Sequence, residues 1–189
     1  MQKLTREFYN RETNLVAKAL LGHHLVYCSQ GIERIGKIVE VEAYVGQHDL
    51  ASHSSKGLTK RTALMFGPPG FAYVYLIYGM YHCFNVVTEP AGVGAAILIR
   101  AIEPIANITE RTQGPGLLCK AMKIDMRLNG HDLLSQDFFI TDEGYEQPNN
   151  IVETPRIGVH YAQDWANKLL RFYIQDNGFV SHPTRLNKT

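Results

Sequence analysis

The pattern of apolar and polar positions is most regular from Arg34 to Val45, where the two kinds of residue alternate. Successive side chains of a β-strand point to opposite faces of its sheet, so Glu40, Glu42 and Tyr44 share one face. The opposite face is expected to hold Lys37, Val39, Val41 and Ala43. The alternation therefore predicts a strand that presents two carboxylates and one aromatic ring on the same side.

Shorter apolar runs predict further strands along most of the chain. They cover His24–Cys28, Phe71–Tyr78, His82–Thr88, Ala95–Ala101, Phe138–Thr141, Ile157–Val159 and Leu170–Ile174. Only Gly79, Met80 and Tyr81 separate the second of these runs from the third. A short glycine-containing connection of this kind is typical of a β-hairpin.

Helical spacing of apolar residues is confined to two segments. One helix is predicted from Thr5 to Leu21, ending at Gly22, and a short one from Leu117 to Met122. Because few helices lie between strands, the pattern favours an α+β fold over a doubly wound one. With no repeat or linker in 189 residues, we expect a single domain over residues 1–189, a curled and mainly antiparallel β-sheet with flanking helices.

Composition restricts the classes of protein to which the chain can belong. No stretch approaches the roughly 18 apolar residues of a membrane helix, and the polar N-terminus leads into no signal core, so we expect a cytoplasmic protein without membrane contact. The three cysteines lie far apart and are expected to be reduced thiols. No metal is expected either, because no common metal motif has the spacing of His48, Asp49 and His53.

One local run of basic residues stands out although the net charge is only +1. Between His53 and Met65 lie Lys56, Lys60 and Arg61, with no acidic residue. A local basic patch attracts nucleic-acid phosphates whatever the total charge. A short basic run is also typical of an ordinary solvated loop. Taken alone, the run leaves phosphate binding and a solvated loop as alternatives.

Three polar residues within apolar strands are candidates for chemistry. Glu42 shares its strand face with a second carboxylate, and such a group is either a general base or a salt-bridged strand glutamate. Asn85 and Arg100 lie in strands rich in apolar residues. If they are buried they need partners, which are either a substrate or an ordinary hydrogen bond or ion pair.

Aromatic residues concentrate in the predicted hairpin. Tyr73 and Tyr75 have the same parity and project to one face, whereas Tyr78 falls at the hairpin end beside Gly79. Rings in a pocket stack on a flat base, and a ring at a hairpin tip can enter a nucleic-acid groove. Tyrosine is also common in strands for packing alone.

Several of these segments resemble, in the right order, the alkyladenine (3-methyladenine) DNA glycosylase family, the mammalian type as distinct from the helix-hairpin-helix type. The resemblance covers most of the chain and rests on Ile38–Tyr44, Ala51–Ser54, Tyr73–Tyr81, Leu98–Pro104, Gly114–Cys119 and Arg156–Val159. It implies a monofunctional hydrolase that flips a damaged purine (3-methyladenine, 7-methylguanine, hypoxanthine or ethenoadenine) out of duplex DNA and leaves an abasic site. It also implies a single α+β domain, no cofactor, double-stranded DNA with damaged purines as the partner, and a monomer.

The resemblance also implies roles for individual residues. Glu42 is the expected catalytic base, and Arg100 helps to hold the attacking water. Tyr78 is expected to fill the gap that the flipped nucleotide leaves in the duplex. The expected walls of the base pocket are Tyr44, His53, Tyr75 and Asn85, of which the last excludes normal guanine. The expected phosphate contacts are Lys56, Lys60 and Arg61.

Two other functions fit parts of the pattern. A noncatalytic nucleic-acid-binding module also uses tyrosines as stacking platforms, but it has no need of a carboxylate that faces the pocket. A sugar hydrolase with Glu40 and Glu42 as its carboxylate pair is the second alternative. That alternative leaves the basic loop and the hairpin tip without a purpose.

Overall fold

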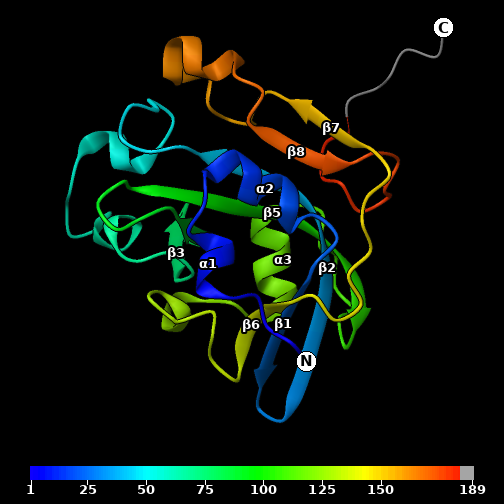
Figure 1. The fold of residues 1–189 in the computed structure, drawn as a ribbon. Coiled ribbons are helices and arrows are strands. Elements are labelled where there is room, and N and C mark those ends of the chain that lie inside the picture. The colour runs from blue at the N-terminus through cyan, green and yellow to red at the C-terminus, as the bar shows by residue number, and fades with distance from the viewer. Residues whose placement is uncertain (184–189) are drawn as a thin grey trace, which may run out of the picture.

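The computed structural model describes residues 1–183, in which eight strands form one antiparallel sheet (Figure 1). The strands are β1 His24–Ser29, β2 Ile32–Tyr44, β3 Ala72–Ile77, β4 Tyr81–Thr88, β5 Ala95–Ala106, β6 Phe138–Thr141, β7 Ile151–Thr154 and β8 Arg171–Ile174. Their order is β3-β4-β5-β2-β1-β6, and the β7–β8 pair joins the sheet where β8 pairs with β2. The predicted α+β class with a curled antiparallel sheet is confirmed.

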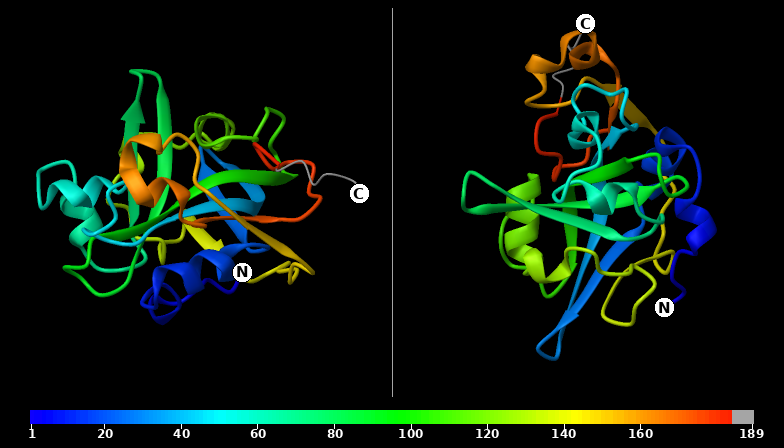
Figure 2. Two further views of the ribbon diagram at one scale, coloured as in Figure 1. Left: turned by 90° about the horizontal axis from the view of Figure 1, so that it is seen from above. Right: turned by 90° about the vertical axis from the view of Figure 1, so that its left-hand side faces the viewer.

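Short helices flank the sheet at opposite sides of the molecule (Figure 2). The helices are α1 Arg6–Tyr9, α2 Thr13–Leu20 and α3 Pro115–Met122, with 3-10 helices η1 His53–Lys56, η2 Ala63–Phe66, η3 Met126–Leu128 and η4 His160–Asn167. Val16 and Leu20 of α2 join Leu118 and Met122 of α3 in one buried apolar cluster with residues of the sheet. The core therefore holds the sheet rigid from both sides, as a site built on strands requires.

Strand β2 is the centre of the sheet because it has three partners. Its first half pairs with β1, Glu40–Glu42 pair with β8, and β5 follows it on the other side. The register against β5 shifts on both sides of Glu40. Such irregularities alter which face a side chain reaches, and Ile38 joins Val41 and Ala43 in the main core cluster. The prediction that Lys37 and Val39 share a sheet face with Val41 is therefore wrong. Glu40 and Glu42 do share one face.

The single helix predicted over Thr5–Leu21 is also wrong, because the chain breaks it between α1 and α2. Glu12 has an extended backbone, and its carboxylate accepts hydrogen bonds from the backbone N–H groups of Asn14 and Leu15. This side chain caps a new helix where the periodic pattern predicted the middle of an old one. Val16 and Leu20 are buried as their spacing predicted, but Leu15 is exposed, and the cap was not predicted.

The β3–β4 hairpin projects from the body of the molecule (Figure 2). Tyr78 and Gly79 turn the chain with positive φ angles of 51° and 69°, and Tyr81 opens β4. The predicted hairpin is confirmed, with Tyr81 in the strand and not in the turn. Its tip carries the exposed side chains of Tyr78 and Met80.

The strand predicted at Ile157–Val159 is wrong, because these residues form a turn after β7 in which Gly158 has a φ angle of 76°. The thiols of Cys83 and Cys119 are buried and that of Cys28 is half-buried, all of them free. None of the helices in residues 1–183 has the length and apolar character needed to span a membrane.

Candidate active site

A cavity of about 290 Å³ opens between β2, the β3–β4 hairpin and the turn after β7. This volume is at the lower end of the range for small-ligand pockets, which suits one planar ring system. Its lining includes Glu42, Tyr44, His53, Tyr73, Tyr75, Tyr78, Cys83, Asn85, Leu98, Arg100, Ile157, Val159 and Tyr161. The cavity is therefore lined mainly by aromatic and apolar side chains, with Glu42 and Arg100 as charged groups among them.

Glu42 is the carboxylate of this cavity, and its side chain is fully buried. Its Oε2 accepts a hydrogen bond from the Tyr44 hydroxyl at 2.9 Å, and its Oε1 accepts one from the backbone N–H of Ile157 at 2.8 Å. Arg100 Nη1 lies 3.3 Å from the same Oε1. A buried carboxylate needs such partners, and together they fix its orientation toward the cavity.

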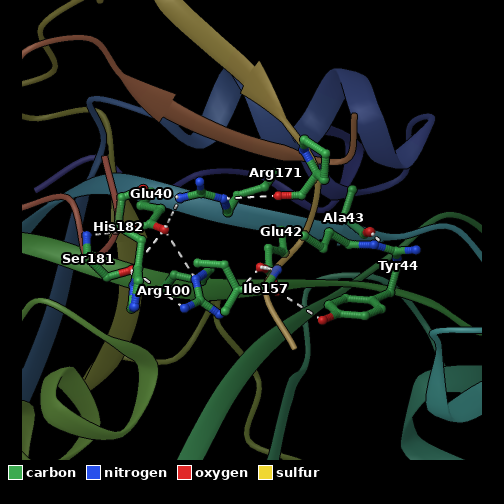
Figure 3. Close-up of polar contacts among 11 residues, drawn as sticks. Glu40, Glu42, Ala43, Tyr44, Arg100, Ile157, Arg171, Ser181 and His182 are labelled. Atoms are coloured by element: carbon green, nitrogen blue, oxygen red, sulfur yellow. Dashed lines mark hydrogen bonds and ion pairs between the residues drawn. The ribbon is translucent and has the colours of Figure 1, made fainter. Parts of the chain in front are cut away.

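Arg100 links Glu42 to a second buried carboxylate, that of Glu40 (Figure 3). Its Nε donates to Glu40 Oε1 at 3.2 Å. Burial acts to lower the pKa of Arg100, but the carboxylates of Glu42 and Glu40 raise it above its ordinary value. The guanidinium therefore stays charged in the core. Glu40 lies outside the set of residues that line the cavity.

A buried ion pair supports the outer wall at Tyr44. Arg156 and Asp49 are both fully buried, with Nη2 and Oδ1 separated by 2.8 Å. The guanidinium lies 4.7 Å from the centre of the Tyr44 ring and also donates to the carbonyl of Ala43. Burial, followed by the charge of Glu42, raises the pKa of Tyr44 well above its ordinary value. The Tyr44 hydroxyl therefore stays protonated and acts as the hydrogen-bond donor to Glu42.

His53 and two tyrosines form a second aromatic part of the cavity wall, besides Tyr44. The His53 ring lies 4.6 Å from Tyr75, centre to centre, and its Nδ1 is 3.0 Å from the Tyr73 hydroxyl. Burial, followed by the charge of Arg61, lowers the pKa of His53. Burial also raises the pKa of Cys83, at the cavity floor, to about 11, so this thiol is a weak nucleophile.

Asn85 lies in the middle of β4, buried, between Tyr73 on β3 and Leu98 on β5. Its Nδ2 donates to the carbonyl of Tyr73 at 3.1 Å. The ordinary explanation for a strand asparagine, a hydrogen bond to backbone, therefore applies. The side chain nevertheless lines the cavity, so both expectations from the sequence are compatible with its position.

Three of the four predicted DNA-contacting residues line this cavity or a second one that shares residues with it. Tyr78 is 88% exposed at the hairpin tip, yet it belongs to the cavity lining. A second cavity, of about 460 Å³, is lined by Lys56 and Arg61 and shares His53 with the first. Arg61 also lies 5.6 Å from the centre of the Tyr75 ring. Lys60 is exposed but outside both linings.

The structure thus gathers the residues predicted for catalysis, base binding and intercalation around one cavity, although it does not test their roles. Sequence reasoning missed the backbone N–H of Ile157 and the Arg156–Asp49 pair. Arg156–Val159 was among the motifs of the resemblance, but it was given no role, and its last three residues were predicted as a strand. In residues 1–183, no group of three or more histidine, cysteine or acidic side chains is arranged to hold a metal ion.

Comparison with known proteins identifies the kind of protein to which this cavity belongs. The family model described as methylpurine-DNA glycosylase matches residues 7–178. The chain belongs to the methylpurine-DNA glycosylase family. A Legionella pneumophila (strain Corby) protein named "Putative 3-methyladenine DNA glycosylase" is 66% identical over 96% of this chain and 99% of its own length.

Two more relatives carry the same name. The Myxococcus xanthus (strain DK1622) protein is 49% identical over 96% of this chain and 94% of its own length. The Alkaliphilus oremlandii (strain OhILAs) protein is 48% identical over 95% of this chain and 98% of its own. The predicted enzyme class, a DNA-repair glycosylase, is confirmed by the family. These relatives are bacterial, and the mammalian type stays a prediction.

Proposed function

We propose that this glycosylase flips alkylated or deaminated purines out of duplex DNA and hydrolyses their N-glycosidic bond, with 3-methyladenine, 7-methylguanine, hypoxanthine and ethenoadenine as substrates. The observation that carries the proposal is Glu42, a fully buried carboxylate aimed into a cavity walled by aromatic rings. A cavity of about 290 Å³ accepts one base and no duplex, so the base has to leave the stack.

In the proposed reaction the bond between C1′ and the purine nitrogen breaks, and its electron pair leaves with the base. The sugar acquires oxocarbenium character, which the nearby carboxylate of Glu42 stabilises. Water attacks C1′ and gives a proton to Glu42, and a base that leaves as an anion, from an uncharged lesion such as hypoxanthine, takes up a proton from solvent. The products are an abasic site and the free base. General-base assistance of this kind is worth about 10²- to 10⁴-fold.

The remaining residues of the cavity bind and select the base. Tyr44 and the opposing pair of His53 and Tyr75 hold it between rings, and Asn85 excludes the amino group of normal guanine. Tyr78 fills the vacated position in the duplex, while Lys56, Lys60 and Arg61 contact phosphates. Since one chain supplies a complete site, the enzyme acts as a monomer.

The two alternatives fit the geometry less well. A stacking platform gives no reason to bury a carboxylate in the pocket with three oriented donors. A sugar hydrolase needs both carboxylates beside the sugar, but Glu40 lies outside the cavity lining with its oxygens in other contacts. The paired-carboxylate alternative therefore lacks its second group.

Single-turnover excision from labelled duplexes, each with one of the four lesions, tests the proposal after alkaline cleavage of abasic sites. Glu42→Gln should reduce base release by at least about 10²-fold and leave binding to the lesion duplex intact, because the amide keeps the shape but accepts no proton. Glu33→Gln, at the exposed end of the same strand, is the matched control. Near-normal excision by the Glu42 variant would rule Glu42 out as the base.

A further inference from the structure

Glu40 has an environment that its position outside the cavity does not explain. Its side chain is fully buried, and four donors surround its two oxygens. Oε1 accepts from Arg100 Nε at 3.2 Å, Arg171 Nη1 at 2.8 Å and the Ser181 hydroxyl at 2.9 Å. Oε2 accepts from the backbone N–H of Ser181 at 2.6 Å. Burial of a charged group is costly, and apolar residues of similar volume often stabilise a fold equally well. Stability alone therefore does not explain Glu40.

We propose that Glu40, together with Arg171 and Ser181, is a positioning group that holds Arg100 in its working orientation beside Glu42. This inference rests on the proposed function, in which Glu42 activates water. Figure 3 shows Glu40 and Ser181 on the side of Arg100 away from Tyr44. The C-terminal segment that carries Ser181 is thereby coupled to the reaction, although it lies outside the cavity lining.

The geometry of Arg100 is the first argument. Each of its three nitrogens faces a different partner: Nε faces Glu40, Nη2 is 3.5 Å from the Ser181 hydroxyl, and Nη1 is 3.3 Å from Glu42. A free guanidinium tends to pair with a carboxylate through two parallel bonds. Glu40 and Ser181 prevent that arrangement with Glu42, so Glu42 Oε2 keeps one donor, the Tyr44 hydroxyl, and a remaining lone pair to accept a proton from water.

The balance of charge is the second argument. Two carboxylates and two guanidinium groups make this buried cluster neutral, with Arg171 facing Glu40 and not Glu42. Arg171 therefore satisfies Glu40 without drawing Arg100 away from the cavity. Its side chain also donates to the carbonyls of Pro155 and His182, at 3.2 and 3.1 Å. Pro155 leads into the turn whose Ile157 N–H holds Glu42.

A double-mutant cycle on single-turnover excision tests whether Glu40 acts through Arg100. Glu40→Gln should slow excision by about 10- to 100-fold, the effect of a misplaced group, and change the Kd for lesion duplex by less than about twofold. In the Arg100→Met background the same change should slow excision by less than about twofold, since Arg100 is no longer there to misplace. Equal factors in both backgrounds would overturn the inference, as would a loss of thermal stability with a normal rate.

Two further variants keep the test decisive. Ser181→Ala removes the contacts of the hydroxyl with Glu40, Arg100 and His182 but no charge. It replaces Glu40→Gln in the cycle if that variant does not fold, and it should slow excision by about threefold or more. Glu103→Gln is the matched control, because Glu103 accepts from Asn177 of the same C-terminal segment at 2.9 Å without contacting Arg100. It should keep the wild-type rate within about twofold. A loss equal to that of Ser181→Ala would mean that these contacts only attach the C-terminal segment to the sheet, and it would overturn the inference.

The two proposals fail in different ways. If the wild-type enzyme releases no base from any of the four lesions, the proposed function fails and the inference falls with it. If the wild type excises and Glu42→Gln does not, while Glu40→Gln and Arg100→Met act independently, only the inference fails. If Glu40→Gln slows excision in the wild-type background but has no effect in the Arg100→Met background, the proposed function and the inference are both supported.

Discussion

At the residue scale, the site depends on donors that come from three separate parts of the chain. Glu42 receives the Tyr44 hydroxyl from its own strand, Arg100 from β5 and the Ile157 N–H from the turn after β7. A carboxylate held in this way loses little freedom when substrate binds. The orientation of Glu42 is fixed when the protein folds, so this group needs no further ordering during the reaction.

Asn85 is the residue expected to separate damaged purines from guanine. Asn85→Ser shortens the side chain on the cavity side of β4 and opens space beside the purine 2-position. We expect guanine excision to rise relative to lesion excision by about tenfold, the size of a steric effect in a pocket. Rates on duplexes with a guanine or hypoxanthine at one position provide the measurement. Leu98→Val, which shortens another side chain of the same cavity, is the control, and parallel changes in both rates would argue against a gate.

His53 should make stability depend on pH. Burial and then Arg61 lower its pKa below the ordinary value of 6.5, so between the folded and unfolded pKa values the unfolded chain binds more protons. Its contribution to stability is complete above the unfolded value and is lost as pH falls through the folded one. Urea midpoints from about pH 8 to about pH 5 should decline less steeply for His53→Gln than for wild type. Because burial also lowers the pKa of His23 and His24, both proteins retain a decline, and parallel curves would contradict the prediction.

The sequence predicted site residues that carry distinctive side chains, and it missed those that act through the backbone or from a distance. Glu42 and Asn85 stood out as polar residues in strands rich in apolar ones, and Tyr75 stood out because aromatic residues concentrate in the hairpin. The contact from Ile157 is made by an N–H group that every residue but proline has. Arg171 and Ser181 gave no signal, since only the pairing of β8 with β2 brings them to Glu40.

At the scale of the element, the β3–β4 hairpin combines a rigid base with an exposed tip. Its base is held by β5 and by buried residues of both strands, including Val74 of β3 and Phe84 of β4. Its tip presents Tyr78 and Met80 to solvent. The cavity lining therefore extends from the buried base of the hairpin to the exposed Tyr78 at its tip.

Tyr78→Ala tests the hairpin as a wedge. Extrusion of a nucleotide costs a few kcal/mol, and a ring that stacks in its place recovers part of this. We expect excision from fully paired duplex to slow by about tenfold, which corresponds to roughly 1.4 kcal/mol, with a smaller loss where the lesion faces a mismatch. Met80→Ala, two residues further along the exposed tip, is the control. Normal excision with reduced thermal stability would identify Tyr78 as a packing residue.

Elements defined by long apolar patterns were predicted well, and elements that depend on a single local contact were not. The strands β1 to β5 follow alternation or apolar runs that the core enforces. The break before α2 depends on the Glu12 cap, and the turn at Gly158 depends on a positive φ angle. The register shifts beside Glu40 reflect how β2 fits β5, a tertiary requirement that β2 alone does not encode.

At the scale of the whole molecule, a protein with a net charge of +1 must bind DNA through a local surface. The hairpin tip, the base cavity and the second cavity with Lys56 and Arg61 adjoin one another. The helices α1 and α2 lie on the side of the molecule away from the projecting hairpin (Figure 2). The proposed function therefore predicts that the charge of this one face decides binding.

Salt dependence tests this assignment of a face. Each phosphate contact that a basic side chain makes releases counterions, so log Kd changes with log salt by about one unit of slope per contact. Neutralising Lys56 and Arg61 to glutamine should weaken damaged and undamaged duplexes alike and reduce the slope by about two units. The same change at Lys18, which lies in α2, and at Lys3, three residues before α1, alters the net charge equally and should leave the slope unchanged. If both pairs reduce the slope equally, the protein responds to its total charge and no single face binds the DNA; if neither does, the phosphate contacts lie elsewhere.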